Sequence, residues 1–263
     1  MDLGIKGKVG LVTGASAGLG FEAALALAME GVKVAINSRS DERLSKAAKK
    51  IKDATGYLPA TFSGDLAEKG VAEKLVNDVK QKMGPIDILV SNAGGPPGGP
   101  FANHSKETWR DSADLTLFSA INLAREVIPD MVKKKWGRIV FITSIAVKQP
   151  VDGLIISNTL RAGLTGFAKT ISNEYAKFGI TINTVCPGYT RTERLNELAE
   201  TKSKSMGISQ DDIFQGWIDS IPAGRLGQPD ELAALIAFLS SEKAAYITGT
   251  AITVDGGCHK GLI

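Results

Sequence analysis

The sequence predicts a single α/β domain, built as a doubly wound parallel sheet of about seven strands with helices on both faces. Three features of the 263-residue chain lead to this fold class. Short runs of β-branched and apolar residues alternate with longer amphipathic stretches, the order expected of parallel strands joined by right-handed crossovers. The runs are almost continuously apolar, as in strands buried on both faces. A glycine-rich turn joins the first run to the first amphipathic stretch.

Hydrophobic periodicity gives the individual elements. The predicted strands are Val9–Thr13, Lys33–Asn37, Ala60–Ser63, Ile86–Ser91, Arg138–Thr143, Thr181–Val185 and Ala251–Val254. The predicted helices cover residues 18–30, 41–54, 67–83, 105–134, 155–178 and 229–240. Two N-terminal signals support the helix starts, because Ser40 precedes two acidic residues and Ser105 precedes Glu107.

The segment 188–227 interrupts this alternation. It is long and polar, and it lies between the sixth predicted strand and the last predicted helix. Loops of this length inside a compact domain usually carry function, so we predict a lid over a substrate. The alternative is a surface excursion that aids assembly.

Composition narrows the function. The chain carries 31 Lys and Arg against 28 Asp and Glu, a net charge of +3, which selects neither nucleic acid nor an anionic membrane. Two cysteines and two histidines are too few for a disulfide framework or a histidine-based metal site, so no metal is expected. The first residues lack the apolar run of a signal peptide, and the apolar runs are too short to span a bilayer. We therefore expect a cytoplasmic protein.

The first predicted strand runs directly into a glycine-rich turn and then into a helix. The spacing Gly-x-x-x-Gly-x-Gly lets the backbone approach a pyrophosphate, whose charge then faces the N-terminus of the helix. This arrangement predicts a Rossmann-type dinucleotide site, with a bare glycine turn as the alternative. The residues expected to hold the pyrophosphate are Gly14, Ser16, Ala17, Gly18, Leu19 and Gly20.

The motif TGASAGLG at residues 13–20 resembles the TGxxxGxG fingerprint of the short-chain dehydrogenase/reductase family. Further segments are similar to motifs of that family, at matching positions along the whole chain. They are Gly64-Asp65-Leu66 after the third strand, Ser91-Asn92-Ala93-Gly94 after the fourth, Ser144 after the fifth, Pro187–Thr192 after the sixth and Val254–Gly257 near the end. The resemblance extends to members similar to 3-oxoacyl-ACP reductase.

The resemblance implies roles for these segments around a nicotinamide dinucleotide. The corresponding residues are Asp65 and Leu66 for the adenine, Asn92, Ala93 and Gly94 for the ribose side, and Pro187, Gly188, Thr190 and Thr192 for the carboxamide. It also implies a homotetramer, and a small-molecule or acyl-carrier-linked substrate.

The end of the second predicted strand bears on the choice between NADP(H) and NAD(H). An acidic residue there would bind the ribose diol of NAD, and none is present. Ser38 can donate a hydrogen bond and Arg39 can pair with a 2′-phosphate, so we expect NADP(H) in preference to NAD(H). The alternative is that Arg39 is a solvent-facing loop charge.

The catalytic positions depart from the family pattern of Asn, Ser, Tyr and Lys. Tyr and Lys form a YxxxK motif in the family, on the helix after Ser. Aligning the segment Arg161-Ala162-Gly163 with the family's Lys-Ala-Gly places Ser157 at the Tyr position and Arg161 at the Lys position. Thr116 stands where Asn is expected, so only Ser144 of the tetrad is retained.

These departures weaken the expected chemistry without removing it. In the family, Tyr donates a proton to the carbonyl oxygen as hydride arrives, whereas a serine hydroxyl is a much weaker acid and an arginine cannot relay a proton. General acid catalysis is worth about 10²–10⁴ in rate. Holding the two reactants together supplies about 7–11 kcal/mol by itself, so hydride transfer can survive the loss.

Two main functions therefore remain. The first is an NADP(H)-dependent oxidoreductase that interconverts a carbonyl and an alcohol. In it Ser144, helped by Ser157, polarises the substrate oxygen, and Arg161 holds the nicotinamide ribose. The second is a dinucleotide-binding protein without dehydrogenase activity, and a lyase or isomerase on the same fold is a third reading. Weaker candidates for the proton donor are Tyr189, Lys148 and His104.

Overall fold

The computed structural model describes residues 1–262 and is organised around one seven-stranded parallel sheet. The strands are β1 (Val9–Val12), β2 (Lys33–Ser38), β3 (Ala60–Ser63), β4 (Ile88–Ser91), β5 (Gly137–Ile142), β6 (Ile180–Pro187) and β7 (Ala251–Val254). Their order in the sheet is β3-β2-β1-β4-β5-β6-β7. Every predicted strand is present, with its ends shifted by at most two residues. The predicted doubly wound sheet is confirmed.

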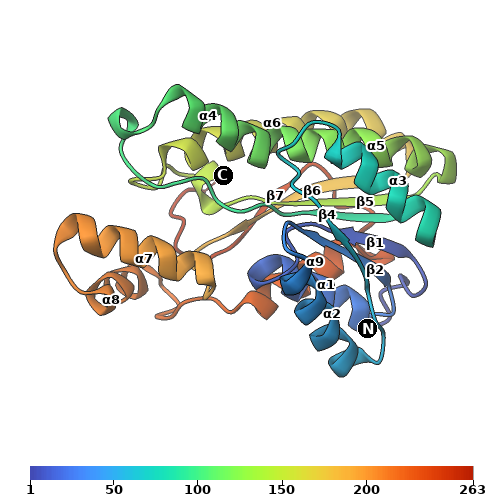
Figure 1. The fold of residues 1–263 in the computed structure, drawn as a ribbon, viewed down its shortest axis with the longest axis horizontal. Helices are drawn as coiled ribbons and strands as arrows, with labels where there is room; N and C mark the ends of the chain where they lie inside the picture. Colours follow the sequence, from blue (N-terminus) through green and yellow to red (C-terminus); the bar gives the residue numbers. More distant parts are fainter. Residues whose placement is uncertain (263) are drawn as a thin grey trace.

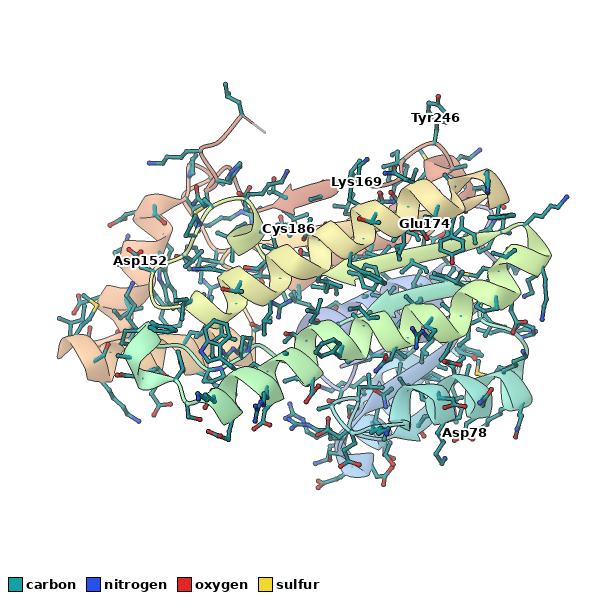
Figure 2. The ribbon with its side chains drawn as sticks, turned by 90° about the horizontal axis from the view of Figure 1, so that it is seen from above. Asp78, Asp152, Lys169, Glu174, Cys186 and Tyr246 are labelled. Carbon is teal, nitrogen blue, oxygen red and sulfur yellow. The ribbon has the colours of Figure 1, made fainter. Side chains whose placement is uncertain are left out.

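Helices cover both faces of this sheet. They are α1 (Gly18–Met29), α2 (Asp41–Thr55), α3 (Val71–Met83), α4 (Lys106–Ala113), α5 (Ser119–Lys134), α6 (Ile155–Tyr175), α7 (Glu193–Met206), α8 (Gln210–Ser220) and α9 (Pro229–Leu239). Figure 1 shows α3, α5 and α6 on one face and α1, α2 and α9 on the other. Figure 2 looks onto the first face, with Asp78 on α3 and with Lys169 and Glu174 along α6.

The strand order reverses between β1 and β4. From β1 the chain moves outward through β2 and β3, whereas β4 begins the run toward β7 on the other side. The loops that follow β1 and β4 therefore leave the sheet in opposite directions, which opens a crevice at its carboxyl edge. All residues of both strands are buried, so the backbone that enters this crevice is held rigidly.

Polar caps fix two helix starts that the sequence predicts. The Ser40 hydroxyl accepts a hydrogen bond from the Arg43 N–H at 3.3 Å, and the Ser105 hydroxyl accepts one from the Thr108 N–H at 3.2 Å. Both predicted starts are confirmed. The cap at Ser40 also fixes the turn that carries Arg43 close to the end of β2.

The helix predicted over residues 105–134 is not continuous. It consists of α4, a single π-helical turn η2 (Asp114–Phe118) and α5. The hydroxyls of Ser112, Thr116 and Ser119 each donate to the carbonyl oxygen four residues earlier. Hydroxyls that bond in this way draw carbonyls out of the helical ladder and bend it. Hydrophobic periodicity does not report such an interruption.

The segment 188–227, expected as a loop, contains α7 and α8. Its two ends meet in a bridge, in which the Arg191 N–H donates to the Gly227 carbonyl at 2.9 Å. Leu195 on α7 packs with Ile213 and Trp217 on α8 in a separate apolar cluster. The prediction of an irregular loop was wrong, because the few apolar residues of each helix are widely spaced among polar ones. The segment projects as a helical pair at one side of the molecule (Figure 1).

The close approach of Gly20 to the Gly14 backbone can be tested by mutation. A Cβ at Gly20 would lie 2.3 Å from the Gly14 carbonyl oxygen, a backbone atom that cannot easily yield. We expect Gly20→Ala to lower the free energy of unfolding by about 1–3 kcal/mol, as overpacking does. Gly216→Ala on α8 is the control, because a Cβ there meets nothing within 4 Å and alanine favours the helix. Equal denaturant midpoints for the two variants would contradict the close approach.

Candidate functional site

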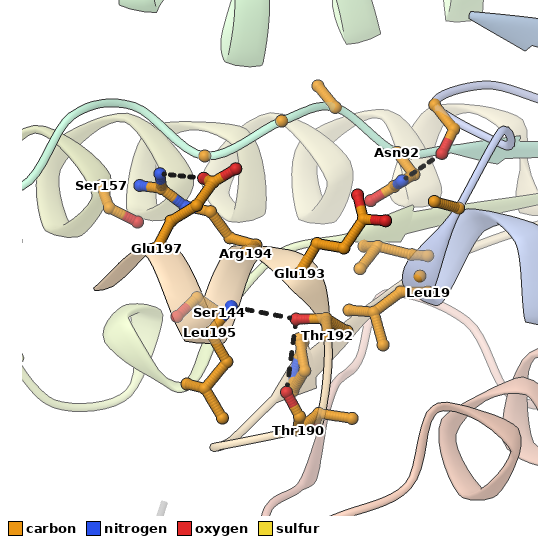
Figure 3. A pocket seen from close by; sticks show the side chains of 18 of the residues that line it. Leu19, Asn92, Ser144, Ser157, Thr190, Thr192, Glu193, Arg194, Leu195 and Glu197 are labelled. Atoms are coloured by element: carbon orange, nitrogen blue, oxygen red, sulfur yellow. Dashed lines mark hydrogen bonds and ion pairs between the residues drawn. The ribbon is translucent and has the colours of Figure 1, made fainter. Parts of the chain in front are cut away.

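A cleft of about 450 Å³ opens at the carboxyl edge of the sheet (Figure 3). It is bordered by the turn after β1, by the ends of β4, β5 and β6, and by α7. The predicted site residues that line it are Gly14, Ser16, Ala17, Gly18, Leu19, Arg39, Asn92, Ala93, Gly94, Ser144, Ser157, Arg161, Pro187, Gly188, Thr190 and Thr192. Four predicted residues do not line it, namely Gly20, Ser38, Asp65 and Leu66. One surface therefore brings together residues from most of the chain.

The turn after β1 is locked to the end of β4. The Thr13 hydroxyl donates to the Asn92 carbonyl at 2.9 Å and accepts from the Asn92 N–H at 3.0 Å. The Asn92 side-chain amide donates to the Gly14 carbonyl at 3.1 Å. Gly14 has a φ of +56°, and a Cβ there would lie 2.8 Å from Asn92. Only glycine permits this approach.

Helix α1 points its N-terminus into the cleft. It begins at Gly18, and the preceding Ala17 supplies no side-chain hydrogen bond to the first turn. The first N–H groups of a helix have no partner within the helix, and together with the helix dipole they attract an anion. A Cβ at Gly18 would lie 3.5 Å from the Thr192 methyl group, so the Thr192 side of the cleft lies close to this turn. This turn fits a pyrophosphate.

Positive charge lies beyond the end of β2. The Arg39 guanidinium is largely exposed and lies 3.8 Å from the Asp65 carboxylate. Arg43, on the first turn of α2, lines the same cleft and forms an ion pair with Glu193 at the start of α7. Arg43 was not among the site residues predicted from the sequence, although the helix start predicted at Ser40 places it close to the end of β2. The Ser38 hydroxyl donates to the Ser40 carbonyl at 3.5 Å.

Two serine hydroxyls mark the opposite end, which we call the serine end of the cleft (Ser144 and Ser157). Figure 3 shows them on the side of Arg194 and Glu197, away from Leu19. The Ser144 oxygen accepts a hydrogen bond from the Ala146 N–H at 3.1 Å, so its own proton is free to be donated. Ser157 lies in the first turn of α6 and is 7% exposed.

Arg161 lies buried beneath the serine end. One guanidinium nitrogen donates to the carbonyl oxygens of Ile142 and Thr143, at 2.9 and 3.0 Å. No carboxylate within residues 1–262 lies in ion-pair distance of it. Burial, with the nearby charge of Arg194, lowers the pKa of Arg161 from 12.5 to about 10. The side chain stays charged at neutral pH.

The other polar residues considered from the sequence lie elsewhere. The Thr116 hydroxyl donates to the Ser112 carbonyl at 2.7 Å, and Leu115 lines the cleft in its place. The Tyr189 ring stacks on Trp217 with the ring centres 5.0 Å apart. The cleft lining includes none of the three weaker candidates for proton donor, Tyr189, Lys148 and His104. Within the described part of the chain, the lining holds no tyrosine, lysine, histidine or cysteine that could donate a proton.

Helix α7 adds lining residues that the sequence analysis missed. Arg194 donates one hydrogen bond to the Pro96 carbonyl at 2.6 Å and another to Glu197 at 3.2 Å. Leu198 lines the cleft beside them. Their common place on the cleft depends on α7 being a helix, which was not predicted from the sequence. Helix α7 is thus joined across the cleft to the glycine-proline segment 94–100.

Residues 1–262 contain no group of three or more His, Cys, Asp or Glu side chains placed to hold a metal ion. No helix among these residues combines the length and the apolar character needed to span a membrane.

Comparison with known proteins places the chain among reductases. Residues 14–259 match the family model described as enoyl-(acyl carrier protein) reductase. The 3-oxoacyl-[acyl-carrier-protein] reductase of Escherichia coli K12 is 35% identical over 98% of this chain and 99% of its own length. The chain is thus similar to this reductase from end to end.

Solved structures agree with this match. L-sorbose reductase from Gluconobacter frateurii, complexed with NADPH and L-sorbose, superimposes with a TM-score of 0.94 at 34% identity and covers 100% of both chains. A variant of actinorhodin polyketide ketoreductase with NADPH gives a TM-score of 0.93 at 34% identity, over 97% of this chain and 98% of its own. The glycine turn, the parallel sheet and the cleft at its carboxyl edge are accounted for together: this chain belongs to the short-chain dehydrogenase/reductase family.

Proposed function

We propose that this protein is an NADP(H)-dependent oxidoreductase that interconverts a carbonyl and an alcohol, in the manner of 3-oxoacyl-ACP reductases. One observation carries the proposal. A single continuous cleft joins a glycine turn suited to pyrophosphate, two arginines near the end of β2, and two serine hydroxyls above a buried arginine. The similarity to known reductases, two of them solved with NADPH, supports the same function.

The residues present fit NADP(H). The first N–H groups of α1 would bind the pyrophosphate, and Gly14 and Gly18 let the turn before them lie close to Asn92 and Thr192. Arg39 and Arg43 would hold the 2′-phosphate, which charge-assisted pairing with guanidinium favours. Arg161 would hold the nicotinamide ribose. The segment 188–227 would act as the lid, through α7.

The chemistry is limited because the lining formed by residues 1–262 holds no tyrosine, lysine, histidine or cysteine to donate a proton. The bound cofactor would supply a hydride for the carbonyl carbon. Ser144 and Ser157 would donate hydrogen bonds to the carbonyl oxygen, and the buried charge of Arg161 would stabilise the negative charge that develops there. Water would then deliver the proton to that oxygen. General acid catalysis by a tyrosine would add about 10²–10⁴ in rate, so we expect slow but real turnover.

A second function is favoured by one observation. Because no tyrosine, lysine, histidine or cysteine of residues 1–262 lines the cleft, the protein would bind the dinucleotide without transferring hydride. The two functions differ in one measurement. Purified protein with NADPH and a panel of carbonyl compounds shows cofactor oxidation above the protein-free rate in the first case, and no such oxidation in the second.

Cofactor choice is tested by fluorescence titration with NADPH and NADH in parallel. We expect NADPH to bind more tightly, because Arg39 and Arg43 add attraction for the 2′-phosphate. The Arg39 side chain is 74% exposed, so its contribution should lie at the low end for a charged hydrogen bond. We therefore expect Arg39→Gln to weaken NADPH binding by about 10-fold and to leave NADH binding unchanged. Lys49→Gln, which removes an exposed charge from the following helix α2, is the control. Equal loss of NADPH and NADH affinity in the Arg39 variant would remove the proposed role.

The effect of lacking a tyrosine as general acid is tested by introducing one. The triple variant Thr116→Asn, Ser157→Tyr and Arg161→Lys should raise kcat for carbonyl reduction by about 10²–10⁴, the usual worth of general acid catalysis. Steady-state kinetics with a carbonyl compound that the parent protein reduces would measure the gain. Adding Ser144→Ala to the triple variant should cancel most of it.

An unchanged kcat in a triple variant that still binds NADPH would argue against the proposed placement of the carbonyl.

A further inference from the structure

The serine end of the cleft carries more positive than negative charge. The ionisable residues that line the cleft within the described chain are Arg39, Arg43, Arg161, Glu193, Arg194 and Glu197. Arg43 and Glu193 pair with each other near β2, and Arg39 lies there too. At the serine end, the guanidiniums of Arg161 and Arg194 remain against the single carboxylate of Glu197. Figure 3 shows the pair of Arg194 and Glu197 there. A neutral ketone leaves this surplus charge without a partner.

Arg194 is placed to exchange its partner. Its ion pair with Glu197 joins residues three apart on α7, and the Glu197 side chain is 64% exposed. Exposed pairs of this kind contribute little, so a carboxylate from a ligand can replace that of Glu197. The hydrogen bond to the Pro96 carbonyl keeps the guanidinium over the cleft. Gly95 leaves space for it, since a Cβ there would lie 2.9 Å from the Arg194 Nε.

Arg161 adds a charge that no protein group neutralises. The residue is 9% exposed, and its guanidinium donates to two carbonyl oxygens rather than to a carboxylate. A buried charge without a counterion is costly, and the nearby charge of Arg194 lowers its pKa further. An anion bound at the serine end would offset both effects.

The remaining walls of the cleft offer both apolar contact and hydrogen-bond donors to such an anion. Leu115, Leu154 and Leu198 line the cleft and offer apolar contact to a short alkyl chain. Ser144 and Ser157 supply donors for a second oxygen. Building on the proposed oxidoreductase, we propose that the substrate is a small oxo carboxylic acid whose free carboxylate binds Arg194 while its ketone oxygen faces the two serines. Reduction by NADPH and a proton would give the hydroxy acid and NADP⁺.

The test compares acids with their neutral esters. Acetoacetate and 2-oxoisovalerate are titrated calorimetrically into the full chain, with and without NADP⁺, which cannot reduce them, against their methyl esters. We expect each acid to bind about 10-fold more tightly than its ester, as a charge-assisted hydrogen bond allows. Arg194→Gln should remove this difference and leave ester binding unchanged, while Arg194→Lys should retain part of it. Lys202→Gln, an exposed charge on the same helix, should behave like the parent.

Three results would each overturn the proposal. The first is equal binding of each acid and its ester, and the second is no binding of any of the four compounds. The third is tighter binding of the neutral thioester acetoacetyl-N-acetylcysteamine than of acetoacetate. The proposed function fails by a different result, because absent NADPH binding or absent turnover shows in the cofactor measurements. The acid-to-ester ratio is measured by heat, so it decides the substrate class independently of turnover.

Discussion

The hydrogen-bonded lock between Thr13, Gly14 and Asn92 is the constraint on which the cleft depends. It joins the first residues after β1 to the first residue after β4, at the point where the strand order reverses. Because two backbones approach this closely, Gly14 and Gly20 have no room for a Cβ. The same approach aims the N-terminus of α1 into the cleft, where its free N–H groups favour a pyrophosphate.

Charge is distributed unequally along this cleft. Near β2 the arginines are exposed and have acidic neighbours, whereas Arg161 at the serine end is buried and bound only to carbonyl oxygens. A lysine in its place could also hold ribose hydroxyls, and would present a proton of more adjustable pKa. In the proposed function, arginine at this position would keep a fixed positive charge without control of proton transfer, and the serine hydroxyls would act by hydrogen bonding.

The sheet and the glycine turn could be predicted because each depends on local sequence. Apolar runs such as β5 are buried on both faces. Gly14 is required because the backbone turns there with a positive φ and lies against Asn92. The π-helical turn at Thr116 and the helices of 188–227 could not be predicted from periodicity, because hydroxyl back-bonding and sparse apolar residues leave no clear pattern. Arg194 was missed for the same reason, since its place over the cleft depends on α7 being a helix.

Transfer of deuterium from C4-deuterated NADPH tests the central claim most directly. The protein is incubated with the pro-R and pro-S deuterated cofactors and a carbonyl compound, and the alcohol is analysed by mass spectrometry. The account predicts deuterium on the carbinol carbon from one of the two cofactors, at a rate above that of heat-denatured protein. Tight NADPH binding with no deuterium in any alcohol would contradict it, and would leave a dinucleotide-binding protein without hydride transfer.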